Sequence, residues 1–349
     1  MTEILIPRTY TSRDPDAPVL DTTDRSTLID VLQACLVDGY SSGPTEKESL
    51  GWESSLNSSE NKAVFRPTDE GSNRIWLHVD ATQGGTGTNH VFTRGYETFT
   101  EWDVDDIVGT GLFGDGHFFV GRLDSLGVRD WLLLGTSRCF YLWIGADGDP
   151  NNAFEDSVFN RPQTDSYGWC GTVHFFGDLG PYPTGYNTAL FQSIYTLTTA
   201  NRPGIYTPMG RPNVYLSQHR VCRNPDGEYL NRVCFLSSAM MGNSISHPIG
   251  GSSMYKRYPD PIWGLPMVRG IVSSERSSIS FQGDMVGLLP GVHVPLVRIA
   301  ESSSSSPMDY LEIVEVNGVN LQAYPVGSGS TSIIQAALLF QSDTPWYSQ

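Results

Sequence analysis

The sequence predicts a mainly β protein with one amphipathic helix near its N-terminus. Apolar residues recur at helical spacing between Thr27 and Tyr40, and from Trp52 onward the spacing becomes the period of two that strands require. Charged residues are only 17% of the chain, and its 36 glycines and 22 prolines suit turns between strands. We therefore expect an α+β N-terminal domain and a β-rich C-terminal domain, built from antiparallel sheets or a β-sandwich.

The N-terminal residues predict an extended arm followed by the helix. Residues 1–20 alternate polar with apolar side chains and carry several prolines, so we expect them to lie on their own domain or on a neighbouring subunit. Thr27 and Asp30 are placed as a loose capping box, and Gly39 is placed to end the helix as a left-handed C′ residue. One face of this helix carries a single apolar stripe, formed by Leu28, Ile29, Leu32, Cys35 and Leu36.

Alternating and apolar runs after Trp52 predict the strands of the first sheet domain. The alternating pattern predicts strands at residues 62–66, 74–80, 91–99, 117–123 and 171–178. Residues 130–135 and 138–145 are continuously apolar, so we expect two central strands joined as a hairpin across Thr136 and Ser137.

Turn signals near residue 201 mark the expected domain boundary. Residues 21–200 are expected to form the helix-plus-sheet domain, and residues 201–349 a β-rich domain with long loops, of which 240–263 is the longest. Asn317-Gly318 is a strong hairpin signal. The strands expected in this half are 214–217, 232–237, 268–272, 278–281, 293–299, 310–315 and 333–340.

Net charge and cysteine usage restrict the partners and the compartment. A formal charge of −16 argues against nucleic acid, because phosphate binding requires a basic face. No apolar run is long enough for a transmembrane helix, and the first residues lack a signal-peptide pattern, so we expect synthesis in a cytoplasm. The five cysteines are then expected to be free buried thiols. A bond between Cys222 and Cys234, which flank the turn at Asp226-Gly227, is left open.

The acidic and histidine residues do not match the spacing of a known metal site. The segment 147–152 begins like a calcium loop but lacks the required glycine and glutamate. Asp103 and Asp105 would share one side of a strand and so could bind a hard cation, although a solvated surface run explains them as well. The seven histidines show no paired zinc spacing, and we expect His78 and His174 to be structural.

The sequence also lacks the local signatures of common enzymes. Gly-x-Ser-x-Gly is absent, and the glycines at 84–87 are not followed by the lysine of a phosphate-binding loop. Residues 109–114 have the letters of a dinucleotide fingerprint but no helix pattern follows them. We therefore expect no catalytic, cofactor-binding or metal-binding residues, and we leave open a pair of carboxylates that only the fold would bring together.

Several segments in combination resemble structural proteins of tailed-bacteriophage virions. The resemblance runs up to about Pro181, and the second half is similar only in style, as in LLPGVHVPL and DTPWYSQ. It implies a virion component without catalytic residues, in the baseplate, tail, neck or head surface. The segments that carry it are IPRTYTSRDPDAPVL, LIDVLQACLVDGY, Gly51-Trp52, NKAVFRP, RIWLHVDAT, RGYETFTEWD, FYLWIGA and HFFGDLGP.

Composition and resemblance together favour a non-enzymatic structural protein of a tail, baseplate or neck. We expect it to contact other virion proteins and copies of itself through residues 1–20 and 240–263, and to bind neither nucleic acid nor membrane. Deletion of residues 1–20 is expected to leave a folded body. Two alternatives stay open: a host-surface or glycan-binding virion protein that uses Tyr258 and Trp263, and a glycan-degrading enzyme.

Overall fold

The computed structural model describes most of the first 144 residues and selected strands of the rest. The described ranges are 4–40, 46–82, 90–103, 106–119, 127–144, 172–178, 188–189, 197–198, 202–203, 222–223, 229–230, 233–235, 267–274, 285–295, 313–316, 319–326 and 336–347. In these ranges every strand pair is antiparallel and there is one α-helix, so the predicted mainly β fold is confirmed.

The predicted helix is present, with a different cap. Helix α1 (Thr27–Gln33) continues into the π-helical turn η1 (Ala34–Asp38), and all five residues of the predicted apolar stripe are buried. The capping box was wrong, because the N-cap residue is Ser26 and it makes no side-chain cap. Thr27 Oγ1 instead accepts a hydrogen bond from the Asp21 amide at 2.9 Å. Gly39 ends the helix as predicted, and its φ of +75° is positive, but its ψ of 175° lies outside the left-handed helical conformation that was expected.

A four-stranded sheet forms the central layer of the molecule, and we call it the central sheet. The predicted hairpin across Thr136 and Ser137 is confirmed, and its two strands are the inner pair. A separate two-stranded sheet pairs β2 (Leu20–Asp21) with β8 (Val128–Arg129), of which β2 follows β1 and β8 precedes β9 in the sequence. The strand order in the central sheet is β1 (Arg8–Thr11), β9 (Trp131–Gly135), β10 (Cys139–Ile144) and β11 (Thr172–Gly177).

A five-stranded sheet packs on one side of the central sheet. The prediction missed most of its last strand, because the glycine-rich residues 106–116 show little alternation. Those residues pair with β6 through three register shifts, which bend the long hairpin. A short 3₁₀ turn, η2 (Ser58–Glu60), joins the first two strands. The order is β3 (Glu53–Asn57), β4 (Lys62–Arg66), β5 (Trp76–Asp80), β6 (His90–Asp103) and β7 (Asp106–Phe119).

A six-stranded sheet from the C-terminal half forms the third layer. The Asn317-Gly318 hairpin is confirmed, since Val316 pairs with Val319. The predicted strands at 214–217 and 278–281 and the long connection 240–263 lie outside the described residues. The order is β17 (Val233–Phe235), β18 (Met267–Ser274), β19 (Met285–Pro295), β22 (Ala336–Gln341), β21 (Val319–Val326) and β20 (Ile313–Val316).

Five two-residue strands complete the described β structure. The pair β13–β14 and the pair β12–β15 both join residues on the two sides of residue 201. β15 and β16, which flank the predicted turn at Asp226-Gly227, pair with each other, while residues 224–228 lie outside the described residues. These strands are β12 (Thr188–Ala189), β13 (Leu197–Thr198), β14 (Arg202–Pro203), β15 (Cys222–Arg223) and β16 (Tyr229–Leu230).

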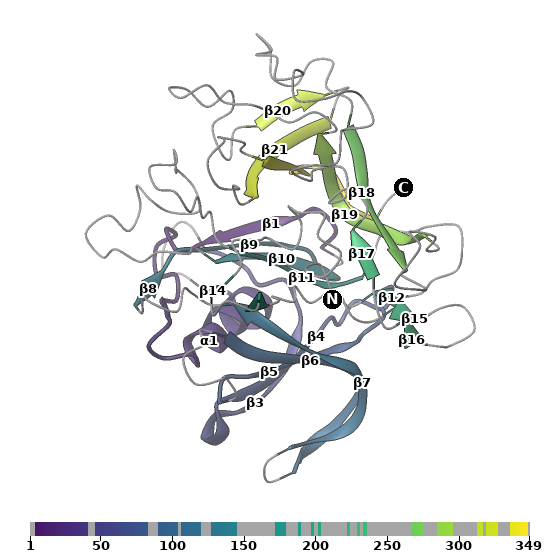
Figure 1. Cartoon of the computed structure of the whole chain (residues 1–349). Helices are drawn as coiled ribbons and strands as arrows, with labels where there is room; N and C mark the ends of the chain where they lie inside the picture. The colour runs from purple at the N-terminus through teal and green to yellow at the C-terminus, as the bar shows by residue number, and fades with distance from the viewer. Residues whose placement is uncertain are drawn as a thin grey trace.

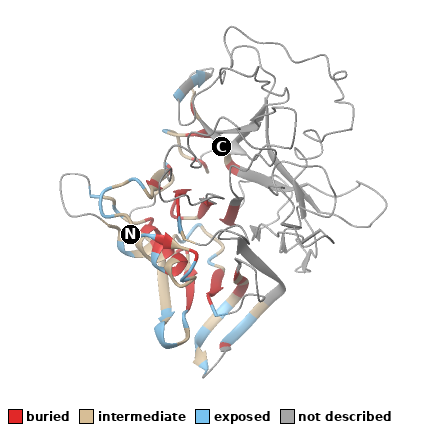
Figure 2. Ribbon diagram, turned by 60° about the vertical axis from the view of Figure 1, so that its left-hand side comes forward, coloured by how far each residue is buried: buried red, intermediate tan, exposed pale blue. Residues whose placement is uncertain are grey.

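The three sheets lie as layers, with α1 between the central and the five-stranded sheet (Figure 1). The main core fills that space, and Figure 2 shows its buried residues gathered around the helix. Trp52 lies at its centre, 5.6 Å from Phe140 and 5.9 Å from Phe176 between ring centroids. The opposite face of the central sheet carries Tyr141, whose ring lies 4.8 Å from that of Phe340.

The N-terminal segment is part of this body. β1 pairs with β9, and both Tyr10 and Leu20 are 1% exposed. Residues 4–22 therefore lie against their own chain, the first of the two alternatives expected for the arm. Deletion of residues 1–20 would remove a strand and two core side chains, so the structure favours a destabilised body over the folded one expected from the sequence.

Candidate functional site

Of the acidic residues considered as metal ligands, the structure describes Asp103 and Asp106. β6 ends at Asp103 and β7 begins at Asp106, and these two residues pair at the end of the hairpin. The expected alternation of Asp103 and Asp105 stays a prediction, because Asp105 lies outside the described residues, as do 147–152. Within the described ranges no group of three or more histidine, cysteine or acidic side chains could hold a metal ion.

His78 lies in a small aromatic cluster on the outer face of the five-stranded sheet. Its ring centroid is 5.9 Å from that of Tyr96 and 5.8 Å from that of Trp102. Trp102 Nε1 donates a hydrogen bond to Ser55 Oγ at 3.0 Å, so the end of β6 reaches back to β3 and covers the histidine. His78 is 5% exposed, which places it in a packed cluster rather than at an open surface.

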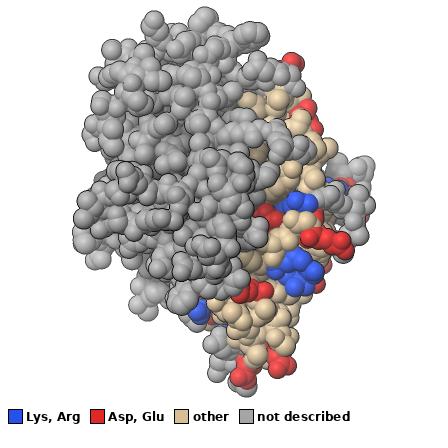
Figure 3. Space-filling model, turned by 90° about the vertical axis from the view of Figure 1, so that its right-hand side faces the viewer, with Lys and Arg blue, Asp and Glu red and all other residues tan. Residues whose placement is uncertain are grey.

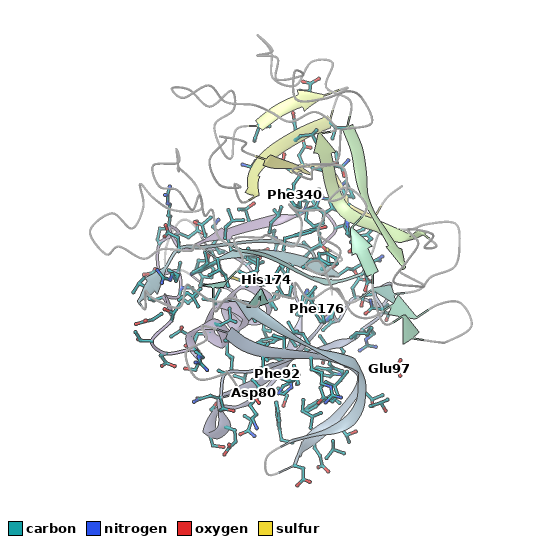
Figure 4. All side chains as sticks on the ribbon, in the orientation of Figure 1. Asp80, Phe92, Glu97, His174, Phe176 and Phe340 are labelled. Atoms are coloured by element: carbon teal, nitrogen blue, oxygen red, sulfur yellow. The ribbon has the colours of Figure 1, made fainter. Side chains whose placement is uncertain are left out.

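The other histidines and the glycine motifs do not form a site in the described chain. His174 is buried on β11, and Figure 4 shows it with Phe176 on the opposite side of the central sheet from Phe340. The fingerprint-like residues 109–114 lie inside strand β7, so no helix N-terminus follows them, as the sequence indicated. His219, His247 and the glycines at 84–87 lie outside the described residues.

Two of the five cysteines are described in full, and both are free. Cys35 and Cys139 are completely buried, which confirms the prediction for these two. Burial raises the pKa of Cys139 to about 12 and raises the pKa of Cys35 as well, so both thiols stay protonated near neutral pH and are poor nucleophiles. Cys222 pairs with Leu230 and Cys234 with Ser273, in two different sheets.

One group of polar residues joins segments that are far apart in the sequence, and we call it the polar junction. Arg138, in the turn between β9 and β10, places its Nε 3.1 Å from Asp69 Oδ2 and its guanidinium over the ring of Tyr347 at 5.1 Å. Ser137 Oγ donates a hydrogen bond to the same carboxyl oxygen of Asp69, at 2.8 Å. The members of the polar junction are Asp69, Ser137, Arg138, Asp178 and Tyr347.

Asp178 is the innermost carboxyl of the polar junction. It follows β11 directly, and both of its carboxyl oxygens lie 3.2 Å from the amide nitrogen of Asn73, which donates to them. Its backbone oxygen accepts a hydrogen bond from the Tyr347 hydroxyl at 2.9 Å. This geometry joins the loop after β4, the end of β11 and the C-terminal residues at one point.

The two carboxyls of the polar junction have opposite pKa shifts. Burial raises the pKa of Asp178 to about 7, and the hydrogen bond from Asn73 and the charge of Arg138 only partly offset it. Burial acts on Asp69 too, but hydrogen bonds from Arg138 and Ser137 outweigh it and lower its pKa below the ordinary value. Near neutral pH, Asp69 is ionised and Asp178 is close to its midpoint.

Both ends of the chain are tied beside the polar junction. The amide of Ser137 donates to Ile4 O at 2.8 Å, and the amide of Trp346 donates to Leu5 O at 3.1 Å. The Trp346 indole packs against Tyr141, with ring centroids 5.7 Å apart, and donates a hydrogen bond to Gln341 O at 2.9 Å. The C-terminal residues thus cover one face of the central sheet and hold the N-terminal segment in place.

No sequence pattern identified the polar junction in advance. Asp178 lies in the segment HFFGDLGP, which contributed to the family resemblance, and Tyr347 lies in DTPWYSQ. Neither segment contains a local motif typical of a functional site. The two segments meet through residues 169 positions apart in the sequence, a distance that no local motif spans. Only the fold brings these side chains together.

No protein-family model matches this chain, and no curated protein matches it. Of the helical residues in the described chain, none belongs to a helix of sufficient length and hydropathy to span a membrane.

Proposed function

We propose that this chain is a non-enzymatic structural component of a tailed-phage virion, in the tail, baseplate or neck. The observation that carries the proposal is the set of segments resembling such proteins. Two of these segments contain β4 and β5, a third covers β10 except for Cys139, and a fourth covers residues 174–177 of β11 and Asp178. The resemblance therefore includes four strands of the two sheets that enclose the main core.

The form of the body suits repeated assembly. The N-terminal segment is hydrogen-bonded to the β9–β10 turn and to Trp346, so the described body is tied together near its termini and can present its surfaces in a fixed geometry. Strands β3 and β7 are the two edges of the five-stranded sheet, and edge strands offer backbone donors and acceptors to a neighbouring chain. Figure 3 shows acidic and basic groups interspersed over the described part of one face, as suits contacts between copies.

Mass spectrometry of purified particles tests this function. Particles of the phage that encodes the chain are banded on a density gradient, and peptides of this chain are quantified against those of a tail-tube protein. We expect a fixed stoichiometric ratio through a second gradient and a high-salt wash. Abundant chain in the lysate but none in the washed particles would contradict the proposal.

A parallel assay separates this function from the enzymatic alternative. Purified chain is incubated with host surface polysaccharide, and new reducing ends are counted. We expect the same count as with heat-denatured chain. Turnover that increases with the amount of native chain would instead favour a glycan-degrading enzyme.

A further inference from the structure

The segment after β22 closes over the polar junction, and we call residues 342–347 the C-terminal strap. The strap belongs to no strand, and the backbone amides of Ser342 and Trp346 bond to Asn320 O and Leu5 O, both at 3.1 Å. Tyr347, at the end of the strap, is also a member of the polar junction. Its hydroxyl donates a hydrogen bond to Asp178 O, and its ring packs against the Arg138 guanidinium. Opening the strap therefore exposes Asp178 without unpairing any sheet.

The charges around Asp178 leave it poorly compensated when it ionises. The titratable or charged groups that face it are Arg138 from the β9–β10 turn, Cys139 from the start of β10, Asp69 from the loop after β4, and Tyr347 from the strap. Arg138 already forms an ion pair with Asp69 at 3.1 Å. When Asp178 ionises, its carboxylate and that of Asp69 share the single positive charge of Arg138, although Asp178 is only 5% exposed to solvent.

We propose that the C-terminal strap is a proton-controlled clasp, closed over Asp178 while this carboxyl is protonated and opened when it ionises. A buried carboxylate without water is unfavourable, so ionisation of Asp178 favours a state in which water reaches it. Opening the strap gives water this access. Opening also frees the residues around Trp346 from the N-terminal segment. This clasp goes beyond the proposed function and does not depend on the chain being a virion protein.

The direction of the pH effect follows from the pKa of Asp178, which is raised from 3.8 to about 7 in the closed site. Between these two values the closed state holds a proton that the open state has released, so closure weakens as pH rises through this window and levels off above it. With an ordinary pKa in the open state, the opening equilibrium increases at most about thirty-fold between pH 5.5 and pH 8.

Hydrogen exchange of the full chain, followed by mass spectrometry, tests the clasp. Rates in peptides covering residues 342–347 are corrected for intrinsic exchange and compared at pH 5.5 and pH 8 in the wild type, Asp178→Asn and Asp343→Asn. Asparagine keeps an acceptor for Asn73 but cannot ionise. We expect strap opening to increase by up to thirty-fold in the wild type and in Asp343→Asn, whose exposed carboxyl lies on the strap, and to stay constant in Asp178→Asn.

The wild-type data also decide the question if Asp178→Asn does not fold. We expect the pH response in residues 342–347 while residues 131–144 stay protected. A strap that responds equally in the wild type and in folded Asp178→Asn overturns the proposal. So does a wild-type strap that shows no response, or one that opens only together with residues 131–144.

Discussion

The two faces of the central sheet are closed by different parts of the chain. The face toward α1 packs on residues of the first 81 positions, such as Trp52, Phe65 and Leu77, which follow one another closely. The opposite face packs on Phe340 and Trp346, which arrive from the far end of the sequence. We infer that the first face supports folding of the whole body, whereas the second fastens the C-terminal half to a body that already exists.

Deletion of residues 1–20 is expected to have the largest effect, because this segment supports both faces. It removes β1, the buried side chains of Tyr10 and Leu20, and the Leu5 carbonyl that holds Trp346. We expect a loss on the order of 5 kcal/mol or more in unfolding free energy, measured by urea denaturation. Ile6→Ala, at a side chain 50% exposed, serves as control and should change stability by less than about 0.5 kcal/mol. A truncated chain as stable as the full one would contradict the account.

Two tryptophans allow a matched comparison of the faces. Trp52 and Trp346 are 3% and 4% exposed, and each indole donates a hydrogen bond to a backbone oxygen. We expect Trp52→Ala to destabilise the whole body by about 3–5 kcal/mol, since a large core side chain is lost. Trp346→Ala should lower the local stability of the C-terminal sheet by a similar amount and leave the rest of the body unchanged. Hydrogen exchange should therefore increase in residues 336–341, while residues 131–135 stay protected. Equal exposure of both regions in both variants would remove the distinction between the faces.

Gly291 provides a smaller test of the second face. It adopts φ +68°, and a Cβ at this position would overlap the Trp346 indole. Gly127, at φ +139°, has no atom within 4 Å of such a Cβ. Both alanine variants carry backbone strain, but only Gly291→Ala also displaces Trp346, at an added cost of about 1–3 kcal/mol. Thermal unfolding of the two variants, followed by near-UV circular dichroism, measures the difference, and identical melting curves would argue against the contact.

Single hydrogen bonds give the smallest expected effects. The Tyr141 hydroxyl donates to Pro290 O at 3.0 Å on the second face, and the Tyr10 hydroxyl donates to Glu48 O at 2.5 Å near the first. Each phenylalanine variant should lose about 1 kcal/mol. Exchange should increase around residue 290 for Tyr141→Phe and around residues 46–50 for Tyr10→Phe. The reverse pattern, or loss of protection across both faces in either variant, would contradict the assignment.

The sequence predicted the first face well because its signals are local. The strand 62–66 and the hairpin across Thr136 were found from apolar patterning, and the buried stripe of the helix from its spacing. Strand β7 was missed because four of its residues are glycines, which contribute no side chain to a pattern. Its pairing is imposed by β6 rather than by its own residues.

The polar junction could not be predicted because its chemistry exists only after folding. Asp69, Arg138 and Asp178 each read as ordinary surface residues in their own segments. Burial, together with the nearby charge of Asp69, gives Asp178 its raised pKa. The contacts of Asp178 with Asn73 and Tyr347 join residues more than 100 positions apart. No residue spacing within a single sequence predicts such a long-range contact.

Cryo-electron microscopy of the intact particle tests the central claim most directly. The account predicts the three-layer body in symmetric copies, with both chain ends on the central sheet and neighbouring subunits against the edges at β3 or β7. A particle map with every density assigned and no copy of this fold would contradict it.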